Sequence, residues 1–196
     1  LRHWITDWNR EKRYLGHTYQ NILLDGINKL DLLKEELESL SFDAIYSSDL
    51  IRCQKTLEYL HLCHSPNLDP RLREMNFGEW EGKKYEDLKE DPSYQKWLDN
   101  WELHGTPSGE NGQEFQQRVD AFVSDMLDRD KLSFENTNIL IMTHGGVIRY
   151  ILSKFEATNS FWASPAVTHG KGLILRLVNR EGEWTCNSLS EVPSAV

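Results

Sequence analysis

Two apolar segments that lie far apart in the sequence each end in a histidine. One comprises residues 139–143 and precedes His144 and two glycines; the other is Leu1, which precedes Arg2 and His3. In an open α/β sheet, a strand that ends in a polar residue beside glycine presents reactive groups at the carboxyl edge of the sheet. A lone histidine is more often a surface or hydrogen-bonded residue than a catalyst. Two histidines at two such strand ends predict one shared pocket.

Segments with helical and strand-like patterns alternate along the chain. Apolar residues at spacings of three and four predict helices, and short apolar runs bounded by turn residues predict strands. We expect helices over residues 24–40, 50–62, 85–101, 113–127 and 146–155. We expect strands over residues 42–46, 139–143, 173–179 and 184–188. This order predicts an α/β fold, a three-layer sandwich in which helices flank a mostly parallel central sheet.

The length and the loops bound the domain organisation. A chain of 196 residues fits one domain, so we expect a single domain over residues 1–196. Residues 71–82 are dense in both charge signs and contain two glycines, which is typical of a functional loop. We expect residues 75–112 to form an excursion of helices and loops that caps the active-site edge of the sheet. Asp91-Pro92 marks a break within it.

The composition limits the partners of this chain. With a formal net charge of −9, it is a poor general binder of nucleic acid or of an anionic membrane. No apolar run approaches the ~20 residues of a membrane span. Cys53, Cys63 and Cys186 have neither metal-site nor disulfide-framework spacing, which fits a reducing compartment, and we expect a cytoplasmic protein. The chain begins at Leu1 and not at methionine, so we expect further residues upstream.

If the ligand of such an acidic chain is an anion, the positive charge must be local. Arg52 falls in the first turn of the helix expected at 50–62, where it adds charge to free backbone N–H groups and favours a bound anion. The simpler interpretation is that Arg52 is a solvated helix residue. Ser47, Ser48 and Asp49 precede this helix and have side chains typical of N-caps.

Five short blocks follow one another along nearly the whole chain. They are residues 1–3 with Thr6 and Asn9, residues 47–56, residues 72–74 with 77–82, Gly109-Glu110 with Phe115 and Arg118, and residues 143–146. In this order they resemble the histidine phosphatase superfamily, which is also called phosphoglycerate mutase-like. Any single block is a weak signal, whereas five in order are a strong one. Trp4 and Ile5 depart from the family, which has glycine and glutamate there, and Trp4 would take up space that a larger substrate needs.

The resemblance implies a site for phosphoryl transfer. His3 would attack phosphorus and become a phosphohistidine, which requires a neutral ring. Arg2 and Arg52 would clamp the phosphoryl oxygens, because guanidinium groups match that geometry. His144 would donate a hydrogen bond to the developing charge, and Asn9 would bind the same group through its amide.

The resemblance also implies an acid that protonates the leaving alkoxide. Glu74 matches the family's acid, and Glu79 and Glu81 are alternatives close by in the sequence. The simpler interpretation is that Glu74 pairs with Arg71 or Arg73 on the surface. Because arginines would neutralise the phosphate charge, we expect no metal and no other cofactor.

The expected function is hydrolysis of a phosphomonoester of a small metabolite. The compact length resembles alpha-ribazole phosphatases and broad-specificity phosphatases, which makes alpha-ribazole 5′-phosphate a candidate substrate, and Thr18 and Gly145 complete the expected substrate-binding set. The alternatives are a mutase of the same superfamily and a phosphate-binding or interaction module without activity. The short excursion favours the hydrolase over the mutase, and the full set of reactive groups argues against the inactive module. We expect a monomer or homodimer, with neither nucleic acid nor membrane as a partner.

Overall fold

The computed structural model describes residues 1–62, 65–128, 137–155, 161, 164 and 166–194. Its central sheet has three parallel strands in the order β2-β1-β3. The first residues of the chain extend this sheet, because Arg2 forms a parallel bridge with Thr143 directly after β3. The chain start and β3 therefore end at the same edge of the sheet. The strands are β1 (Ala44–Ser47), β2 (Asn67–Leu68) and β3 (Ile139–Met142).

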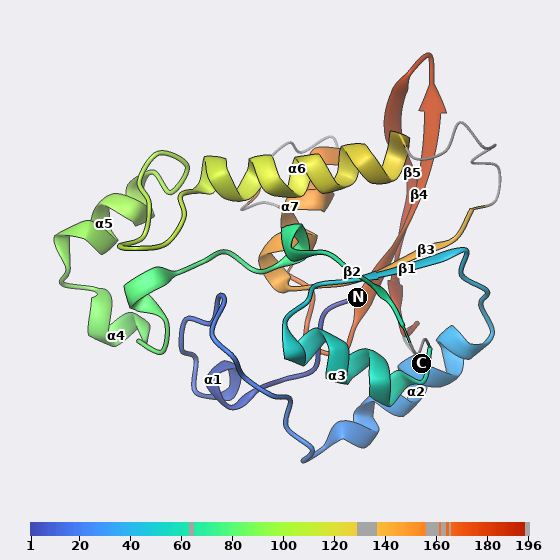
Figure 1. Cartoon of the computed structure of the whole chain (residues 1–196), viewed down its shortest axis with the longest axis horizontal. Coiled ribbons are helices and arrows are strands. Elements are labelled where there is room, and N and C mark those ends of the chain that lie inside the picture. The colour runs from blue at the N-terminus through green and yellow to red at the C-terminus, as the bar shows by residue number, and fades with distance from the viewer. Residues whose placement is uncertain (63–64, 129–136, 156–160, 162–163, 165, 195–196) are drawn as a thin grey trace.

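Helices cover both faces of this sheet (Figure 1). Successive side chains of a strand point to opposite faces. Accordingly, Leu140 and Met142 pack with α2 and α3, whereas Ile141 packs with α6 and α7. This arrangement confirms the predicted α/β fold, in which helices flank a parallel sheet. The flanking helices are α2 (Asp31–Glu38), α3 (Ile51–Leu60), α6 (Gly112–Asp128) and α7 (Gly145–Phe155).

A β-hairpin completes the described chain after α7. β4 (Gly172–Arg180) pairs with β5 (Glu183–Val192) in antiparallel orientation, and this pair contains both strands expected in the region. Glu181 and Gly182 form the two-residue turn with positive φ angles of 56° and 92°. Turns of this hand match the twist of the two strands.

The first long helix starts later than its pattern predicts. The helix expected at 24–40 begins as a 3-10 turn, η1 (Ile27–Leu30), and continues as α2. Gly26 precedes it in the left-handed conformation (φ 69°), which is incompatible with an α-helix running through this point. The preceding loop contains a short helix that was not expected, α1 (Asp7–Arg10). The Thr6 side chain caps it by accepting from the Asn9 N–H, and the Asn9 side chain accepts from the Thr6 N–H.

The helix expected at 85–101 is divided at the break expected at Asp91-Pro92. It forms α4 (Tyr85–Leu88) and α5 (Pro92–Asp99). The Asp91 carboxylate accepts a hydrogen bond from the Ser93 N–H over 2.8 Å, and proline occupies the first position of α5.

The expected N-caps of α3 serve another purpose. Leu50 is the cap residue of this helix and provides no side-chain cap hydrogen bond, so the expectation for Ser47, Ser48 and Asp49 is wrong. The Ser48 hydroxyl bonds to His144 over 2.9 Å instead, and Asp49 forms an ion pair with Arg73. These residues connect elements around the sheet edge.

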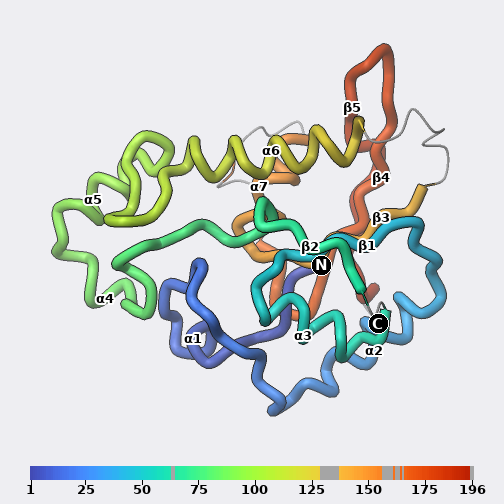
Figure 2. The backbone as a smooth tube through the Cα atoms, viewed as in Figure 1, coloured from blue at the N-terminus to red at the C-terminus, as the bar shows by residue number. Residues whose placement is uncertain are grey.

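Residues 75–112 leave the sheet and return at the start of α6. Figures 1 and 2 show this excursion as the green segment on the left, away from the hairpin at the upper right. Its interior is aromatic: Trp80, Tyr94, Trp97 and Trp101 are all buried. In the part of the chain that the structure describes, no helix is long and apolar enough to cross a membrane.

Candidate active site

His3 lies at the end of the N-terminal strand segment and is almost completely buried. Its Nδ1 lies 2.6 Å from the Trp4 carbonyl oxygen. A carbonyl can only accept, so Nδ1 carries the proton and Nε2 keeps the free lone pair. Burial lowers the pKa of His3 well below its ordinary value, and the charge of Arg52 lowers it further. The ring is therefore neutral at neutral pH and carries a nucleophilic nitrogen.

His144 follows β3, and its ring centroid lies 5.1 Å from that of His3. Both ring nitrogens have protein partners: Nδ1 accepts from Arg52 Nε over 3.3 Å, and Nε2 lies 2.9 Å from the Ser48 hydroxyl. Burial and the charge of Arg52 hold the pKa of His144 well below its ordinary value, so this ring is neutral too. The hydrogen bond that we expected from His144 to a phosphoryl oxygen requires one of these partners to be exchanged.

Arg52 is fully buried in the first turn of α3, so the interpretation as a solvated residue is wrong. Its Nη2 donates to the Gly16 carbonyl over 2.7 Å, and its Nη1 lies 3.3 Å from the Thr18 carbonyl. Each Nη carries two hydrogens, so one on each remains for an anion. Among the described residues, Arg52 has no carboxylate within ion-pair distance. Burial without a counter-charge favours a bound anion.

Arg2 contributes a second guanidinium. Its Nη1 donates to the Val167 carbonyl over 2.6 Å, while its Nε is buried and has no hydrogen-bond partner in the part of the chain that is described. Gly145 allows this position, because a Cβ there would lie 3.1 Å from the Arg2 Cζ. A buried donor without a partner is rare in proteins and fits a place where a ligand oxygen binds.

Glu74 faces the N-terminus of α7. Its carboxylate accepts from the Gly146 N–H and the Met75 N–H, each over 3.0 Å. Arg71 and Arg73 have other partners: Arg71 pairs with Asp69 and Asp125, and Arg73 pairs with Asp49. The interpretation of Glu74 as one half of a surface pair with either arginine is therefore wrong.

The two alternative acids are engaged elsewhere. The Glu81 carboxylate accepts from the backbone N–H groups of His17 (2.7 Å) and Thr18 (2.6 Å), and so holds the loop whose carbonyls bind Arg52. The Glu79 carboxylate accepts from the Ser108 hydroxyl over 2.9 Å. Glu81 thus supports the site through the backbone, and Glu79 belongs to the excursion.

Asn9 and Thr18 have structural contacts in addition to the roles expected from the sequence. The Asn9 side-chain oxygen accepts from the Thr6 N–H (3.2 Å) and lies 3.0 Å from the Thr6 hydroxyl. Thr18 meets Arg52 through its backbone carbonyl. Their contacts with substrate remain predictions.

Trp4 does not follow the expectation that it fills the pocket. Its side chain belongs to the apolar cluster under α2 and α3, with Ile22 and Leu30, and it packs against Gly170. Gly170 has a positive φ of 72°, and a Cβ there would lie 2.7 Å from the indole ring. The bulk of Trp4 is therefore accommodated by the core and by a glycine opposite it.

His169 is a site residue that the sequence analysis missed. Its ring centroid lies 5.0 Å from that of His3, and its Nδ1 lies 3.1 Å from the His3 carbonyl. Burial and the charge of Arg2 lower the pKa of His169 to about 4. The Arg2 N–H donates to the Lys171 carbonyl over 2.9 Å, so the start of β4 lies at the same sheet edge as the ends of the parallel strands. The sequence signal for His169 is the pair His169-Gly170, which stands before a strand, whereas His3 and His144 follow one.

The site therefore gathers a fully buried arginine, Arg52, a half-buried one, Arg2, and three neutral histidines in a chain whose net charge is −9. Such a group attracts a small, highly charged anion and offers a nucleophile next to it. Among the described residues, no group of three or more His, Cys, Asp or Glu side chains has the arrangement of a metal site.

Comparisons with known proteins show which family this chain belongs to. The sequence profile of the histidine phosphatase superfamily (branch 1) matches residues 1–192. The adenosylcobalamin/alpha-ribazole phosphatase of Escherichia coli (strain K12) is 30% identical over 159 residues, which cover 79% of this chain and 76% of that protein. The structure of the alpha-ribazole phosphatase from Shigella flexneri has a TM-score of 0.80 at 28% identity and covers 100% of this chain and 96% of its own. The structure of a phosphoglycerate mutase from Thermus thermophilus has a TM-score of 0.65 at 33% identity and covers 87% and 86%.

Proposed function

Because this chain belongs to the histidine phosphatase superfamily, we propose that it is a phosphomonoester hydrolase that works through a phosphohistidine on His3. The substrate is a small phosphorylated metabolite, and alpha-ribazole 5′-phosphate is the first candidate, since alpha-ribazole phosphatases are among its relatives. The observation that carries this proposal is a buried, neutral His3 with a free Nε2 beside Arg2 and Arg52, neither of which has a carboxylate partner among the described residues.

In the first step, the His3 Nε2 lone pair forms a bond to phosphorus and the ester P–O bond breaks. The ring gains a positive charge, and the Nδ1–H bond to the Trp4 carbonyl stabilises it. The leaving alkoxide takes a proton from Glu74. Proton donation of this kind is worth ~10²–10⁴-fold in rate when the alcohol is a poor leaving group.

Arg2 and Arg52 bind the three phosphoryl oxygens during this step. Their fixed partners, the carbonyls of Val167, Gly16 and Thr18, orient both guanidinium groups before substrate arrives. Donors that need no reorganisation stabilise developing charge most effectively, and each is worth ~10²–10³-fold. The Asn9 amide adds a hydrogen bond to the same group, and His144 adds another when its Nε2 exchanges the Ser48 hydroxyl for a phosphoryl oxygen.

In the second step, water attacks the phosphohistidine from the side that the alcohol has left. Glu74, now deprotonated, takes a proton from this water; the N–P bond breaks and its electron pair returns to Nε2 of His3. One carboxylate thus serves as acid and then as base, which requires that it stay in place between the steps. Inorganic phosphate leaves last.

We further propose that residues 1–196 form one catalytic domain and that residues 75–112 cap the substrate end of the site. Support comes from the two ends of the excursion, which meet directly after Glu74: the Asn76 carbonyl accepts from the Glu110 N–H over 3.0 Å. A cytoplasmic location fits the spacing of the cysteines.

The test is a panel of phosphate esters that includes nitrophenyl phosphate, alpha-ribazole 5′-phosphate and 3-phosphoglycerate. We expect release of inorganic phosphate from the first two, and none from either by His3→Ala with an unchanged circular dichroism spectrum. Conversion of 3-phosphoglycerate to its isomer without phosphate release would favour the mutase. Lack of turnover on every ester would overturn the proposal.

A further inference from the structure

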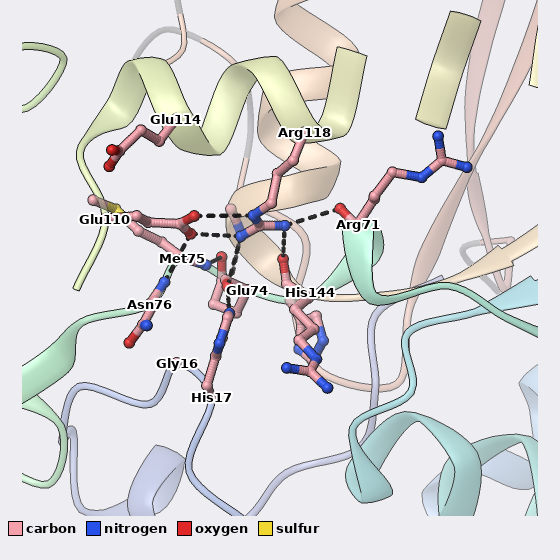
Figure 3. A network of polar contacts seen from close by, with 12 residues as sticks. Gly16, His17, Arg71, Glu74, Met75, Asn76, Glu110, Glu114, Arg118 and His144 are labelled. Atoms are coloured by element: carbon pink, nitrogen blue, oxygen red, sulfur yellow. Dashed lines mark hydrogen bonds and ion pairs between the residues drawn. The ribbon is translucent and has the colours of Figure 1, made fainter. Parts of the chain in front are cut away.

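Arg118 binds three backbone carbonyls around the proposed acid (Figure 3). Its guanidinium donates to the carbonyls of Arg71 (2.9 Å), Arg73 (2.7 Å) and Glu74 (2.8 Å). It also pairs with the Glu110 carboxylate through Nη2 (2.6 Å) and Nε (3.0 Å). A guanidinium has five N–H donors, so these five hydrogen bonds use its whole capacity.

The segment that carries Glu74 depends on such contacts. Residues 74–77 belong to no helix or strand, so this stretch of backbone is not held by the hydrogen bonds of a regular element. Buried backbone carbonyls require partners, and the Arg118 side chain donates to those of both Glu74 and Arg73. The side chains of Arg118 and Glu110 are 19% and 14% exposed. Loss of either partner would leave a mostly buried charge without compensation.

The same pair connects the acid to neighbouring segments. The Glu110 carboxylate accepts from the Asn76 N–H over 2.8 Å, which fixes the backbone two residues after Glu74. His17 Nε2 lies 3.0 Å from the Glu74 carbonyl and donates to it from the loop that holds Arg52. The Glu74 backbone is therefore fixed from α6, from the excursion and from the arginine-binding loop together.

We infer that Arg118 and Glu110 are positioning residues for Glu74, an inference that rests on the proposed function. They fix the backbone so that the Glu74 carboxylate reaches the Gly146 N–H and the Met75 N–H, and it stays there through both proton transfers. Neither residue touches the phosphoryl group. Their contribution to the rate therefore depends on the acid and not on the nucleophile.

The leaving group separates this role from a general loss of structure. Arg118→Lys keeps the charge but offers a compact ammonium, which cannot form the planar fork. We expect kcat/KM for an alkyl phosphate to fall about 10²-fold, the effect of a misplacement near 1 Å, with a loss below about threefold for nitrophenyl phosphate. Glu110→Gln, which keeps the acceptor for Asn76, should act in the same direction. Equal losses on both substrates would overturn the inference.

Arg71→Met is the matched control, because Arg71 lies three residues before Glu74 in the 3-10 turn η2 (Pro70–Leu72) and its side chain pairs with Asp69 and Asp125. It should leave the ratio of the two substrates unchanged. In a Glu74→Gln background, Arg118→Lys should cause no further loss of alkyl phosphate turnover, since residues that act as a unit are not additive. The full about 10²-fold loss in that background would show that Arg118 acts elsewhere.

Amide hydrogen exchange gives a readout that needs no turnover. The N–H groups of Met75 and Gly146 bind the Glu74 carboxylate, so Arg118→Lys should accelerate their exchange, whereas Arg71→Met should not. Unchanged exchange in Arg118→Lys would refute the positioning role even if the wild-type protein hydrolysed no ester. If exchange were accelerated in Arg118→Lys while the wild-type protein hydrolysed no ester, the positioning role would stand and the proposed function would be refuted.

Discussion

Gly146 is the position where a single methyl group tests the location of the acid. It is the second residue of α7, and its N–H holds the Glu74 carboxylate over 3.0 Å. A Cβ at this position would lie 2.3 Å from Glu74 Oε1. Ordinary contact begins near 3.4 Å, so in Gly146→Ala the carboxylate must move by about 1 Å.

The consequences for stability and for activity should differ. The atom that must move is the end of a flexible side chain, and alanine is a better helix former than glycine by about 1 kcal/mol, so the variant should fold with undiminished stability. A displacement of about 1 Å at a reacting group costs on the order of 10²-fold in rate. We therefore expect this loss in kcat/KM for alkyl phosphates, and a small loss for nitrophenyl phosphate.

The assay compares both substrates in Gly146→Ala and in Gly105→Ala, with urea unfolding of each. Gly105 is the control, because a Cβ there meets its nearest neighbour at 3.6 Å, which is ordinary contact. A stable Gly146→Ala protein with full activity on alkyl phosphates would refute the placement of the acid beside α7.

Three further predictions concern the charged groups of the site. The pKa of His169 is about 4 in the folded protein and ordinary in the unfolded chain, so the unfolded chain binds more protons below pH 6.5. This group therefore leaves the free energy of unfolding unchanged above pH 6.5 and should lower it by up to about 3 kcal/mol as the pH drops toward 4. Urea unfolding at pH 7 and pH 4.5 measures this loss of stability. If His169→Asn lost as much free energy of unfolding between the two pH values as the wild-type protein, the lowered pKa of His169 would be contradicted. Arg52→Lys should lower kcat/KM for nitrophenyl phosphate by ~10²–10³-fold, because the compact ammonium cannot reach the Gly16 carbonyl, the His144 ring and a phosphate at the same time. Activity near that of the wild type would show that Arg52 has no part in the mechanism. Glu74→Gln should reduce turnover of alkyl phosphates by ~10²–10⁴-fold while nitrophenyl phosphate, whose leaving group needs little protonation, loses far less; equal losses would assign Glu74 to binding and not to proton donation.

Elements with a regular apolar pattern could be predicted from the sequence, and those fixed by a single tertiary contact could not. The strand before His144 and the helix after it were visible because their apolar residues face two packed layers. Periodicity alone continues the α2 pattern back to residue 24, whereas in the fold Gly26 interrupts it. The side chain of Ser48 is typical of a helix cap, but in the fold its hydroxyl meets His144.

The candidate site shows the same division. His3 and His144 stand at strand ends, and sequence reasoning reaches them through that position. His169 precedes an antiparallel strand, so only the pairing of Arg2 with Lys171 brings it to the same edge. Trp4 packs into the core against Gly170, a residue far away in the sequence, so no local pattern shows where its side chain lies.

In the proposed mechanism, His3 carries the phosphoryl group between the two steps. Rapid quenching of the protein with nitrophenyl phosphate into alkali, in which phosphohistidine survives, followed by peptide mass analysis, tests this directly. We expect one added phosphoryl group on the peptide that contains His3, formed before steady-state turnover and lost on further incubation, and none in His3→Asn. A phosphoryl group on another residue, or turnover by His3→Asn at the wild-type rate, would contradict it.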